Sequence, residues 1–423
     1  MATQARSHCG VGELTRYLAQ LKWAVPAAVL VAAAIVGIHF LWPTKVPDDL
    51  HLVEPDPSRY FSSAKLDEAR SYARFLRING LLSLAVLVAV LVVYAARGAR
   101  FTRESAAGRV GTGMLLGMLG FAIVWLAQLP FGIATLWWER RHDVAKLGYL
   151  EWVVNSWLAV GGVFLFVCVA IGIVMALAGP LRDRWWIAGV PVFAGVGLLF
   201  TFVSPFLLGD LKSLHNERLE ATADRYARSQ RLPDIPVKVQ EVKKYTTEPN
   251  AAATGLGPSR RIIVWDTLLG KPFDHDEIGV VIAHELGHHS RHHLWKLSGW
   301  GAIFTVPLTF GIALATRRRG GMYEPRAVPV ALLVAVLLQI AMSPAANVVS
   351  RRYEAEADWV ALQTTRDPVA AREAFVDLAS TSLADPRPPS WSYVFSDNHP
   401  TISQRIAMVN AWAARHGAAG SDR

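Results

Sequence analysis

The stretch Val280-Val281-Ile282-Ala283-His284-Glu285-Leu286-Gly287-His288-His289 organises the rest of the chain. Its apolar start is typical of a buried helix, and on a helix residues four apart project from one face. The imidazoles of His284 and His288 can therefore reach the same metal ion, and Glu285 flanks that face as a base for an activated water. A helix that merely contains these three residues fits the short pattern too. The rest of the chain must therefore supply a third ligand.

Composition separates this 423-residue chain from ordinary soluble proteins. Hydrophobic residues make up 52% of it and charged residues only 18%, whereas about a quarter of a typical soluble chain is charged. The formal net charge of +9 does not indicate nucleic acid, because Lys and Arg lie between apolar blocks, as cations that flank membrane spans do. The two cysteines, Cys9 and Cys168, predict neither a disulfide nor a cysteine metal site.

Seven apolar runs approach or exceed the roughly 20 residues that a helix needs to cross a bilayer. They are Trp23–Trp42, Ile78–Ala96, Gly113–Trp138, Trp152–Pro180, Trp185–Gly209, Leu297–Thr316 and Ala327–Asn347. Trp and Tyr gather at their ends, as in the aromatic belts of membrane proteins. We therefore predict a mainly α, multi-pass membrane protein with about seven transmembrane helices. The first is expected to be an uncleaved span, since no small-residue cleavage site follows it.

These spans divide the chain into four regions. Residues 1–209 form a membrane region with five spans. Residues 210–296 form a polar segment that carries the helix of His284. Residues 297–347 contribute two further spans, and residues 348–423 form a polar carboxy-terminal segment with helices expected at 368–383 and 401–416.

The polar segment 210–296 is expected to fold as a small α+β unit. Residues 210–231 have a helical pattern that prolines end. Three short runs then predict a β-meander, at residues 236–242, 250–255 and 261–265. Asp274 with Glu277 three residues later forms a capping box, which starts the helix of His284. A strand beside such a helix can dock an extended peptide at its free edge.

A third metal ligand can come from Glu354. Two spans separate it from the His284 helix, so both lie on the same side of the membrane. Hydrolytic zinc commonly takes two His and one carboxylate and leaves a fourth position for water. Asp358, one helical turn further, can accept a hydrogen bond from a ligating histidine. A solvated acid paired with Arg351 or Arg352 explains Glu354 equally well on the residues alone.

Other histidines near the motif also have metal-ligand spacing. His288 with His292, and His289 with His293, are four residues apart, but neither pair has a glutamate directly after its first member. We interpret His289, His292 and His293 as polar residues at the membrane interface. On the residues alone, His399 is interpreted as a surface or capping residue.

Four features together resemble the integral-membrane zinc metallopeptidases of the type I CAAX prenyl protease family, which includes the HtpX-type quality-control proteases. The features are His284-Glu285-Leu286-Gly287-His288; Asn347-Val348-Val349-Ser350-Arg351 leading to Glu354 and Ala357-Asp358; Asn250-Ala251 with Thr254-Gly255 and residues 261–268; and His399-Pro400-Thr401 with Arg405. Seven spans, with the histidine motif after the fifth, are similar to the CAAX branch rather than the shorter HtpX branch.

The resemblance implies a gluzincin-like α+β metallopeptidase domain with one Zn²⁺ per chain. Its assignments are His284, His288 and Glu354 as zinc ligands, Glu285 as general base and then acid, Asn250 and Ala251 on the substrate-binding strand, and His399 and Arg405 near the reacting carbonyl. Residues 139–148 match the family's loop only loosely. That departure bears on specificity for prenylated peptides more than on proteolysis.

The sequence thus predicts a membrane-embedded zinc metalloendopeptidase that acts on membrane-associated or prenylated-peptide-like substrates. A quality-control protease of HtpX type is the alternative. A metal-binding transporter fits less well, because no acid or base interrupts a span centre. An inactive scaffold would have no chemical need for Glu285.

The expected partners are a peptide or protein substrate, lipidated substrates included, and the lipid bilayer, with no nucleic acid. A slight excess of Lys and Arg favours an active site on the cytoplasmic face, which in a bacterium would be that of the plasma membrane.

Overall fold

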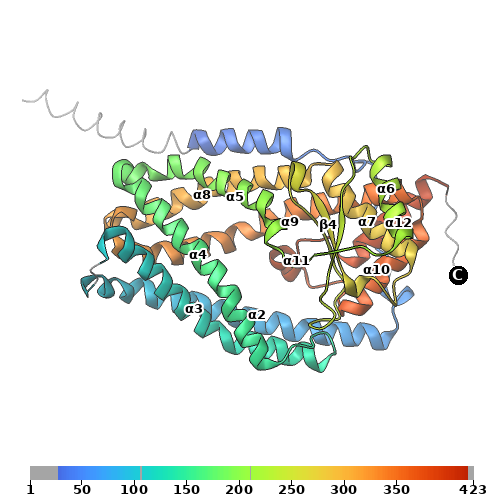
Figure 1. Ribbon diagram of the computed structural model, residues 1–423, viewed down its shortest axis with the longest axis horizontal. Helices are drawn as coiled ribbons and strands as arrows, with labels where there is room; N and C mark the ends of the chain where they lie inside the picture. The colour runs from blue at the N-terminus through green and yellow to red at the C-terminus, as the bar shows by residue number, and fades with distance from the viewer. Residues whose placement is uncertain (1–26, 105–106, 210, 418–423) are drawn as a thin grey trace, which may run out of the picture.

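The computed structural model describes residues 27–104, 107–209 and 211–417. Long helices run along the longest axis of the molecule, and a small sheet with shorter helices gathers at one end (Figure 1). The membrane part and the polar part of the sequence therefore occupy different ends, joined by helices that continue from one into the other.

Long apolar helices account for six of the predicted spans. They are α2 (Ser63–Arg97), α3 (Gly108–Arg141), α4 (Tyr149–Leu181), α5 (Trp185–Leu207), α8 (His293–Thr316) and α9 (Val328–Thr365). By length and composition, 5 helical stretches of the described chain can cross a membrane, one of which, Tyr149–Leu207, includes both α4 and α5. The structure thus confirms a mainly helical protein with several helices that are long and apolar enough to span a membrane.

The first predicted span is described only in part. Its residues 27–41 form a shorter apolar helix, and residues 23–26 lie outside the described part of the chain. The count of seven spans, like the division of the chain into four regions, stays a prediction.

Helix α9 connects the membrane part to the polar end. Its 38 residues span about 57 Å at 1.5 Å per residue. The helix begins as the last span, includes Pro344 without a break, and ends only at Thr365. Glu354 and Asp358 are therefore carried on a direct extension of a membrane helix.

The sheet has four strands in the order β1-β2-β4-β3. They are β1 (Lys212–Ser213), β2 (Val237–Gln240), β3 (Ala251–Thr254) and β4 (Arg261–Trp265). β2 pairs with β4 in parallel, and β3 pairs with β4 antiparallel. The predicted β-meander is therefore wrong. Ile262, Ile263 and Val264 of β4 are at most 3% exposed, and a strand buried on both faces takes the centre of a sheet.

The expected helix at 210–231 is also corrected. Lys212–Ser213 form strand β1, and the helix, α6, spans only Glu217–Ser229. It starts where it does because the Asn216 side chain accepts a hydrogen bond from the Leu219 main-chain nitrogen at 3.1 Å, the usual N-cap interaction.

Helix α7 (His275–Ser290) is packed from two sides. Ile278, Ile282 and Leu286 join the core beneath the sheet. Val280 and Ala283 pack against Trp359 of α9 and the carboxy-terminal helices α10 (Pro368–Ser382) and α12 (Ile402–Arg415). The predicted capping box of Asp274 and Glu277 is present. With both faces buried, α7 has one orientation, and its histidines point to a fixed place.

The carboxy-terminal segment contains one helix more than expected. α10 and α12 correspond to the helices predicted at 368–383 and 401–416, and a short helix, α11 (Ser390–Ser396), lies between them. α11 packs on α9. Residues of α11, such as Ser392 and Phe395, line the same cavity as His284.

Candidate metal centre

Three predicted ligands converge between α7 and α9. His284 Nε2 and His288 Nε2 are 3.1 Å apart, and they lie 3.2 and 3.6 Å from the two carboxylate oxygens of Glu354. One ligand atom from each of the three lies within 4.8 Å of the others. Two imidazoles and one carboxylate are the donor set of hydrolytic zinc sites.

The burial of the Glu354 carboxylate also indicates that these three residues can hold a metal ion. Its side chain is 12% exposed, and among the described residues its Oε2 atom is buried without a well-aligned hydrogen-bond donor. A buried carboxylate oxygen normally has a partner. A metal ion between Glu354 and the two histidines would be that partner.

A close crossing of α7 and α9 brings the ligands together. A Cβ atom added to Gly287 would lie 3.3 Å from the Cα atom and 3.4 Å from the carbonyl oxygen of Ala357. Small residues at a crossing let two helix backbones approach closely. Gly287 lies between the ligands of α7, and Ala357 lies three residues after Glu354, so the approach of the backbones sets the ligand distances.

A buried ion pair orients His284. Its Nδ1 atom donates to Asp358 Oδ1 at 2.8 Å, and Asp358 also accepts hydrogen bonds of 2.8 and 2.6 Å from Arg405. Burial disfavours the charged form of His284, but the neighbouring carboxylates of Asp358 and Glu354 outweigh it and raise the pKa of His284 to about 10. A metal ion would displace the proton on Nε2, whereas Asp358 keeps the proton on Nδ1 and so leaves the Nε2 lone pair for the ion. Arg405, predicted to lie near the reacting carbonyl, holds Asp358 with its guanidinium.

Glu285 lies between the ligand group and the outer strand of the sheet. Its side chain is buried, and its Oε2 atom accepts a hydrogen bond of 2.6 Å from the main-chain nitrogen of Ala253 in β3. Glu285 does not belong to the group of three ligand atoms. This position fits the predicted role of a base beside a metal rather than that of a ligand.

Strand β3 forms the edge of the sheet next to Glu285. The main-chain nitrogen of Trp265 donates to the carbonyl of Asn250. Because the polar groups of an antiparallel strand alternate in direction, those of Ala251 and Ala253 point away from β4. Asn250 and Ala251 line the large cavity described below, as expected for a strand that could receive an extended chain.

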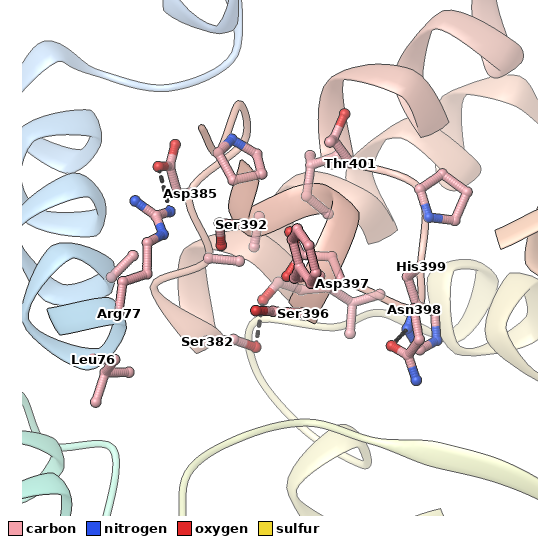
Figure 2. Close-up of a pocket in the computed structure, with 18 of the residues that line it drawn as sticks. Leu76, Arg77, Ser382, Asp385, Ser392, Ser396, Asp397, Asn398, His399 and Thr401 are labelled. Carbon is pink, nitrogen blue, oxygen red and sulfur yellow. Dashed lines mark hydrogen bonds and ion pairs between the residues drawn. The ribbon is translucent and has the colours of Figure 1, made fainter. Parts of the chain in front are cut away.

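His399 lies at the rim of the ligand group. Its Nε2 atom is 3.2 Å from Glu354 Oε2, and its Nδ1 atom is 2.7 Å from the side-chain oxygen of Asn398. The side chain is 54% exposed. His399 and Asn398 point into the pocket from the loop before α12 (Figure 2). A molecule bound in front of Glu354 would meet this imidazole first.

A cavity of about 1350 Å³ starts at His284 and Glu285 and extends between α2 and α9. It exceeds the 300–1,000 Å³ of typical small-ligand pockets. Its wall on the membrane side is apolar and includes Leu76, Leu81, Leu84, Leu87, Val336 and Ile340. An ion pair of 2.7 Å between Arg77 of α2 and Asp385 lies across the cavity from His399 (Figure 2). The cavity is large enough for several residues of a peptide.

His289 and His293 are buried inside the protein, and their interpretation as polar residues at the membrane interface stays a prediction. His289 is 4% exposed, and its Nε2 atom lies 3.3 Å from the carbonyl oxygen of Arg261 in β4. Burial lowers the pKa of His289 to about 4, although the Arg261 carbonyl opposes this. His293 is fully buried and contacts His288 and Glu356. Only His292 is exposed.

Comparison with known proteins, like the geometry of the ligand group, indicates a metallopeptidase. Residues 213–413 match the model of peptidase family M48. The chain is 25% identical over 418 residues to the "Uncharacterized metalloprotease YhfN" of Bacillus subtilis. The aligned region covers 91% of this chain and 96% of that protein. The chain is 25% identical over 325 residues to a CAAX prenyl protease 1 homolog of Arabidopsis thaliana, covering 70% and 73% of the two chains.

A relative of another type and a solved structure also match. A protease HtpX homolog of Acidiphilium cryptum is 28% identical over 221 residues, which are 46% of this chain and 74% of that protein. The crystal structure of S. mikatae Ste24p has a similar fold, with a TM-score of 0.68 at 19% identity over 92% of this chain and 97% of that one.

The helical fold, the ligand group and these similarities define a membrane metallopeptidase. More particularly, the chain is an integral-membrane zinc metalloendopeptidase that resembles the type I CAAX prenyl proteases and their HtpX relatives.

Proposed function

We propose that the protein hydrolyses peptide bonds of membrane-associated substrates with one Zn²⁺ held by His284, His288 and Glu354. The observation that carries this proposal is the convergence of these three side chains beside Glu285 at the end of a large cavity. Zinc would supply a Lewis acid that polarises the scissile carbonyl and lowers the pKa of a water toward about 7.

Glu285 acts as the general base and then as the acid. Its carboxylate accepts a proton from the attacking water and returns it to the leaving amine, a role that typically contributes about 10²–10⁴-fold to the rate. The hydrogen bond from Ala253 supports this role, because it holds the carboxylate between the ligand group and the strand where a peptide would lie. His399 donates a hydrogen bond to the developing oxyanion, which its position beside Glu354 supports.

The substrate binds as an extended chain along β3. The outward groups of Ala251 offer main-chain hydrogen bonds, and Asn250 extends the same edge. Asp358 and Arg405 do not touch the substrate in this proposal. They keep His284 oriented.

The apolar wall of the cavity between α2 and α9 supports lipidated or apolar peptides as substrates. Relatives of this chain are named CAAX prenyl proteases, which agrees with such substrates. A quality-control protease of HtpX type is the second candidate, favoured by the similarity to HtpX homologs. That similarity spans 46% and 59% of this chain in two such relatives, against 70% for the plant CAAX enzymes. We therefore favour the CAAX-like activity.

We further propose that the active site faces the cytoplasm, in a bacterium from the plasma membrane. The excess of Lys and Arg near the polar segments supports this orientation. A reporter enzyme fused after Arg423 tests it, because a reporter that is active only in the cytoplasm would then be active.

The test of the reaction uses purified protein and a reporter peptide. Glu285→Gln should retain zinc and lose cleavage, whereas Glu354→Ala should lose zinc, as measured by elemental analysis. Glu220→Gln, on the exposed face of α6, is the matched control and should change neither property. Cleavage at the parent rate by the Glu285→Gln protein would contradict the proposal.

A further inference from the structure

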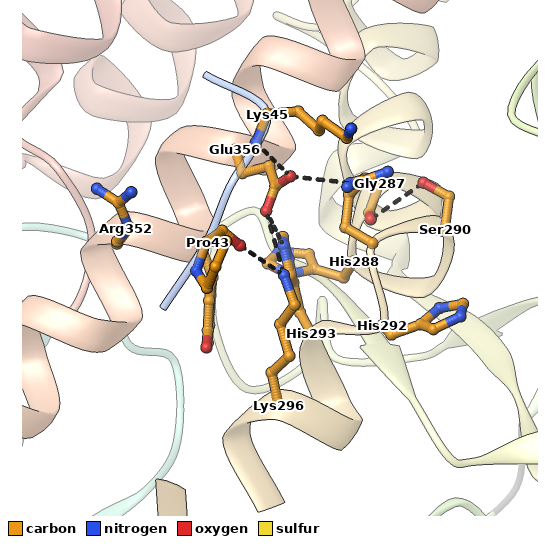
Figure 3. A network of polar contacts seen from close by, with 12 residues as sticks. Pro43, Lys45, Gly287, His288, Ser290, His292, His293, Lys296, Arg352 and Glu356 are labelled. Carbon is orange, nitrogen blue, oxygen red and sulfur yellow. Dashed lines mark hydrogen bonds and ion pairs between the residues drawn. The ribbon is translucent and has the colours of Figure 1, made fainter. Parts of the chain in front are cut away.

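A second buried network lies behind His288, on the side of α8. Its members come from the carboxyl end of α7, the amino end of α8, from α9 and from the segment Leu41–Lys45 at the end of the amino-terminal helix (Figure 3). These parts of the chain are far apart in sequence. At its centre are His293 and Glu356, neither of which the sequence assigned to the metal site.

The network begins at a candidate metal ligand. His288 Nδ1 and His293 Nδ1 are 3.0 Å apart, and His293 Nε2 is 3.0 Å from Glu356 Oε2. The nitrogen that faces the other ligands is His288 Nε2, and a ligating nitrogen must be unprotonated. The His288 proton is therefore assigned to Nδ1, which donates to His293 Nδ1, and His293 in turn donates from Nε2 to Glu356.

The ring of His293 is held in one orientation. The residue is fully buried and stacks on the ring of Tyr353, with centroids 4.8 Å apart and planes at 16°. The Tyr353 hydroxyl accepts from Trp300 Nε1 at 2.9 Å and donates to the carbonyl of Leu41 at 2.7 Å. His293 can therefore not turn away from His288 without breaking this packing.

Glu356 closes the network as an acceptor for several donors. It is fully buried, and its Oε1 atom accepts hydrogen bonds of 2.8 Å from Arg291 Nε and from the main-chain nitrogen of Lys45. The ammonium group of Lys296 lies 3.7 Å from Oε2 and donates to the carbonyl of Pro43 at 3.0 Å. A buried carboxylate with this many donors is stable as an anion.

The three carboxylates on α9 thus have different partners. Glu354 belongs to the ligand group, and Asp358, one turn later, lies on the same face and reaches His284 directly. Glu356 projects from another face, toward α8. It reaches the ligand group only through the imidazole of His293.

We propose that His293 and Glu356 are positioning residues that hold His288 in the tautomer and orientation that bind the metal. This inference rests on the proposed metal site. Partners that orient ligating histidines typically affect metal affinity by about 10–100-fold. Alternatively, His293 and Glu356 only hold α8, α9 and the segment Leu41–Lys45 together. Their removal would then affect folding and leave metal affinity unchanged.

The experiment measures zinc affinity of the full chain in detergent by competition with a chelator, in a Glu285→Gln background. His293→Phe keeps a ring to stack on Tyr353 and removes both nitrogens, so its affinity should fall about 10–100-fold. His292→Asn is the matched control. His292 is exposed and has a positive φ of 59°, which Asn tolerates, so the affinity should stay unchanged.

Two further variants separate positioning from folding. His293→Gln should restore most of the affinity, because its amide can accept from His288 and donate to Glu356. In the double variant of His293→Phe with Glu356→Ala, the loss should be smaller than the sum of the single losses, since both act through one chain of bonds. The visible absorption of bound Co²⁺ should change in His293→Phe and not in His292→Asn.

A zinc affinity of His293→Phe within about twofold of the parent, with an unchanged Co²⁺ spectrum, overturns the proposal. Should that variant fail to fold, Glu356→Ala gives the same measurement from the other end of the network, with the same two outcomes. A parent protein that binds zinc and cuts no peptide would contradict only the proposed function, because these affinities are measured without cleavage.

Discussion

Gly287 of α7 lies against Ala357 of α9 so closely that a Cβ on Gly287 would be 3.3 Å from the Ala357 Cα atom. Two ligands lie one and three residues away from Gly287 in α7, and Glu354 lies three residues before Ala357 in α9. The separation of the two helices at this point therefore sets the separation of the metal ligands.

Enlarging Gly287 should therefore weaken metal binding. Gly287→Val should push α9 away, lower zinc affinity at least tenfold and destabilise the fold by about 1–3 kcal/mol, as overpacked cores do. Gly279→Ala in the same helix is the control, because its Cβ meets only ordinary contacts at 3.6 Å or more. Zinc titration and thermal unfolding of both variants check this, and equal affinities would contradict it.

Removing Arg405 should destabilise the protein through Asp358. Asp358 is 2% exposed and accepts both hydrogen bonds of the guanidinium. In Arg405→Met the buried carboxylate loses its main partner, which typically costs about 3–5 kcal/mol. Thermal unfolding should show the loss, and zinc affinity should fall with it, because Asp358 is then free to turn away from His284. Arg415→Met, which breaks an exposed pair with Asp49, should change neither measurement.

His399→Ala should reduce the rate and spare the metal. The imidazole is more than half exposed at the rim of the site and faces the cavity, so its removal leaves the three ligands in place. Loss of one oxyanion donor typically lowers kcat about 10²–10³-fold. Steady-state kinetics with elemental analysis tests this. A variant that loses zinc would show instead that His399 supports Glu354.

The stability of the protein should depend on pH through Glu277. Burial raises the pKa of this carboxyl to about 7 from an ordinary value of 4.5, although its hydrogen bond from Asp274 opposes the shift. The folded state thus holds the proton at a pH where the unfolded state has lost it. The stabilisation is complete below pH 4.5 and is lost as the pH rises through 7.

Glu277→Gln should remove this dependence. The amide oxygen can still accept the hydrogen bond of the Asp274 main-chain nitrogen, so the helix start is kept, but no proton is released on unfolding. The thermal midpoint of the parent should fall between pH 5 and pH 7.5 more steeply than that of the variant. Parallel curves for the two proteins would place the titrating group elsewhere.

The segment before α2 should stabilise the site through one main-chain donor. The nitrogen of Lys45 donates to Glu356. Lys45→Pro removes that donor and should lower the thermal midpoint and weaken zinc binding several-fold. Lys45→Ala keeps it and should resemble the parent. An equal effect of the two substitutions would assign the change to the Lys45 side chain.

The parts of the site that local periodicity governs could be read from the sequence. His284 and His288 follow from the four-residue repeat of a helix, and Asp358 follows from Glu354 in the same way. The parity of the spans brought Glu354 to the same side of the membrane as the histidines. The roles of these residues in catalysis stay predictions, whereas the structure brings them together.

The network of His293 and Glu356 could not be read in this way. α7 ends at Ser290, His292 has a positive φ, and α8 starts at His293. This break turns the chain so that His293 meets His288 five residues earlier, a separation that no continuous helix uses for facing side chains. Glu356 lies only two residues after Glu354 and yet has a separate set of partners.

The sequence by itself determined six long apolar helices, three of the four strands and the helix of the histidine motif, because these depend on interactions between residues close in the chain. Tertiary structure decided which strand is central in the sheet, how near α7 and α9 approach at Gly287, and which histidines are buried. Those outcomes depend on the competition of distant segments for the same buried space. The ligands of His284-Glu285-Leu286-Gly287-His288 belong to the first group, and the groups that hold them in place belong to the second.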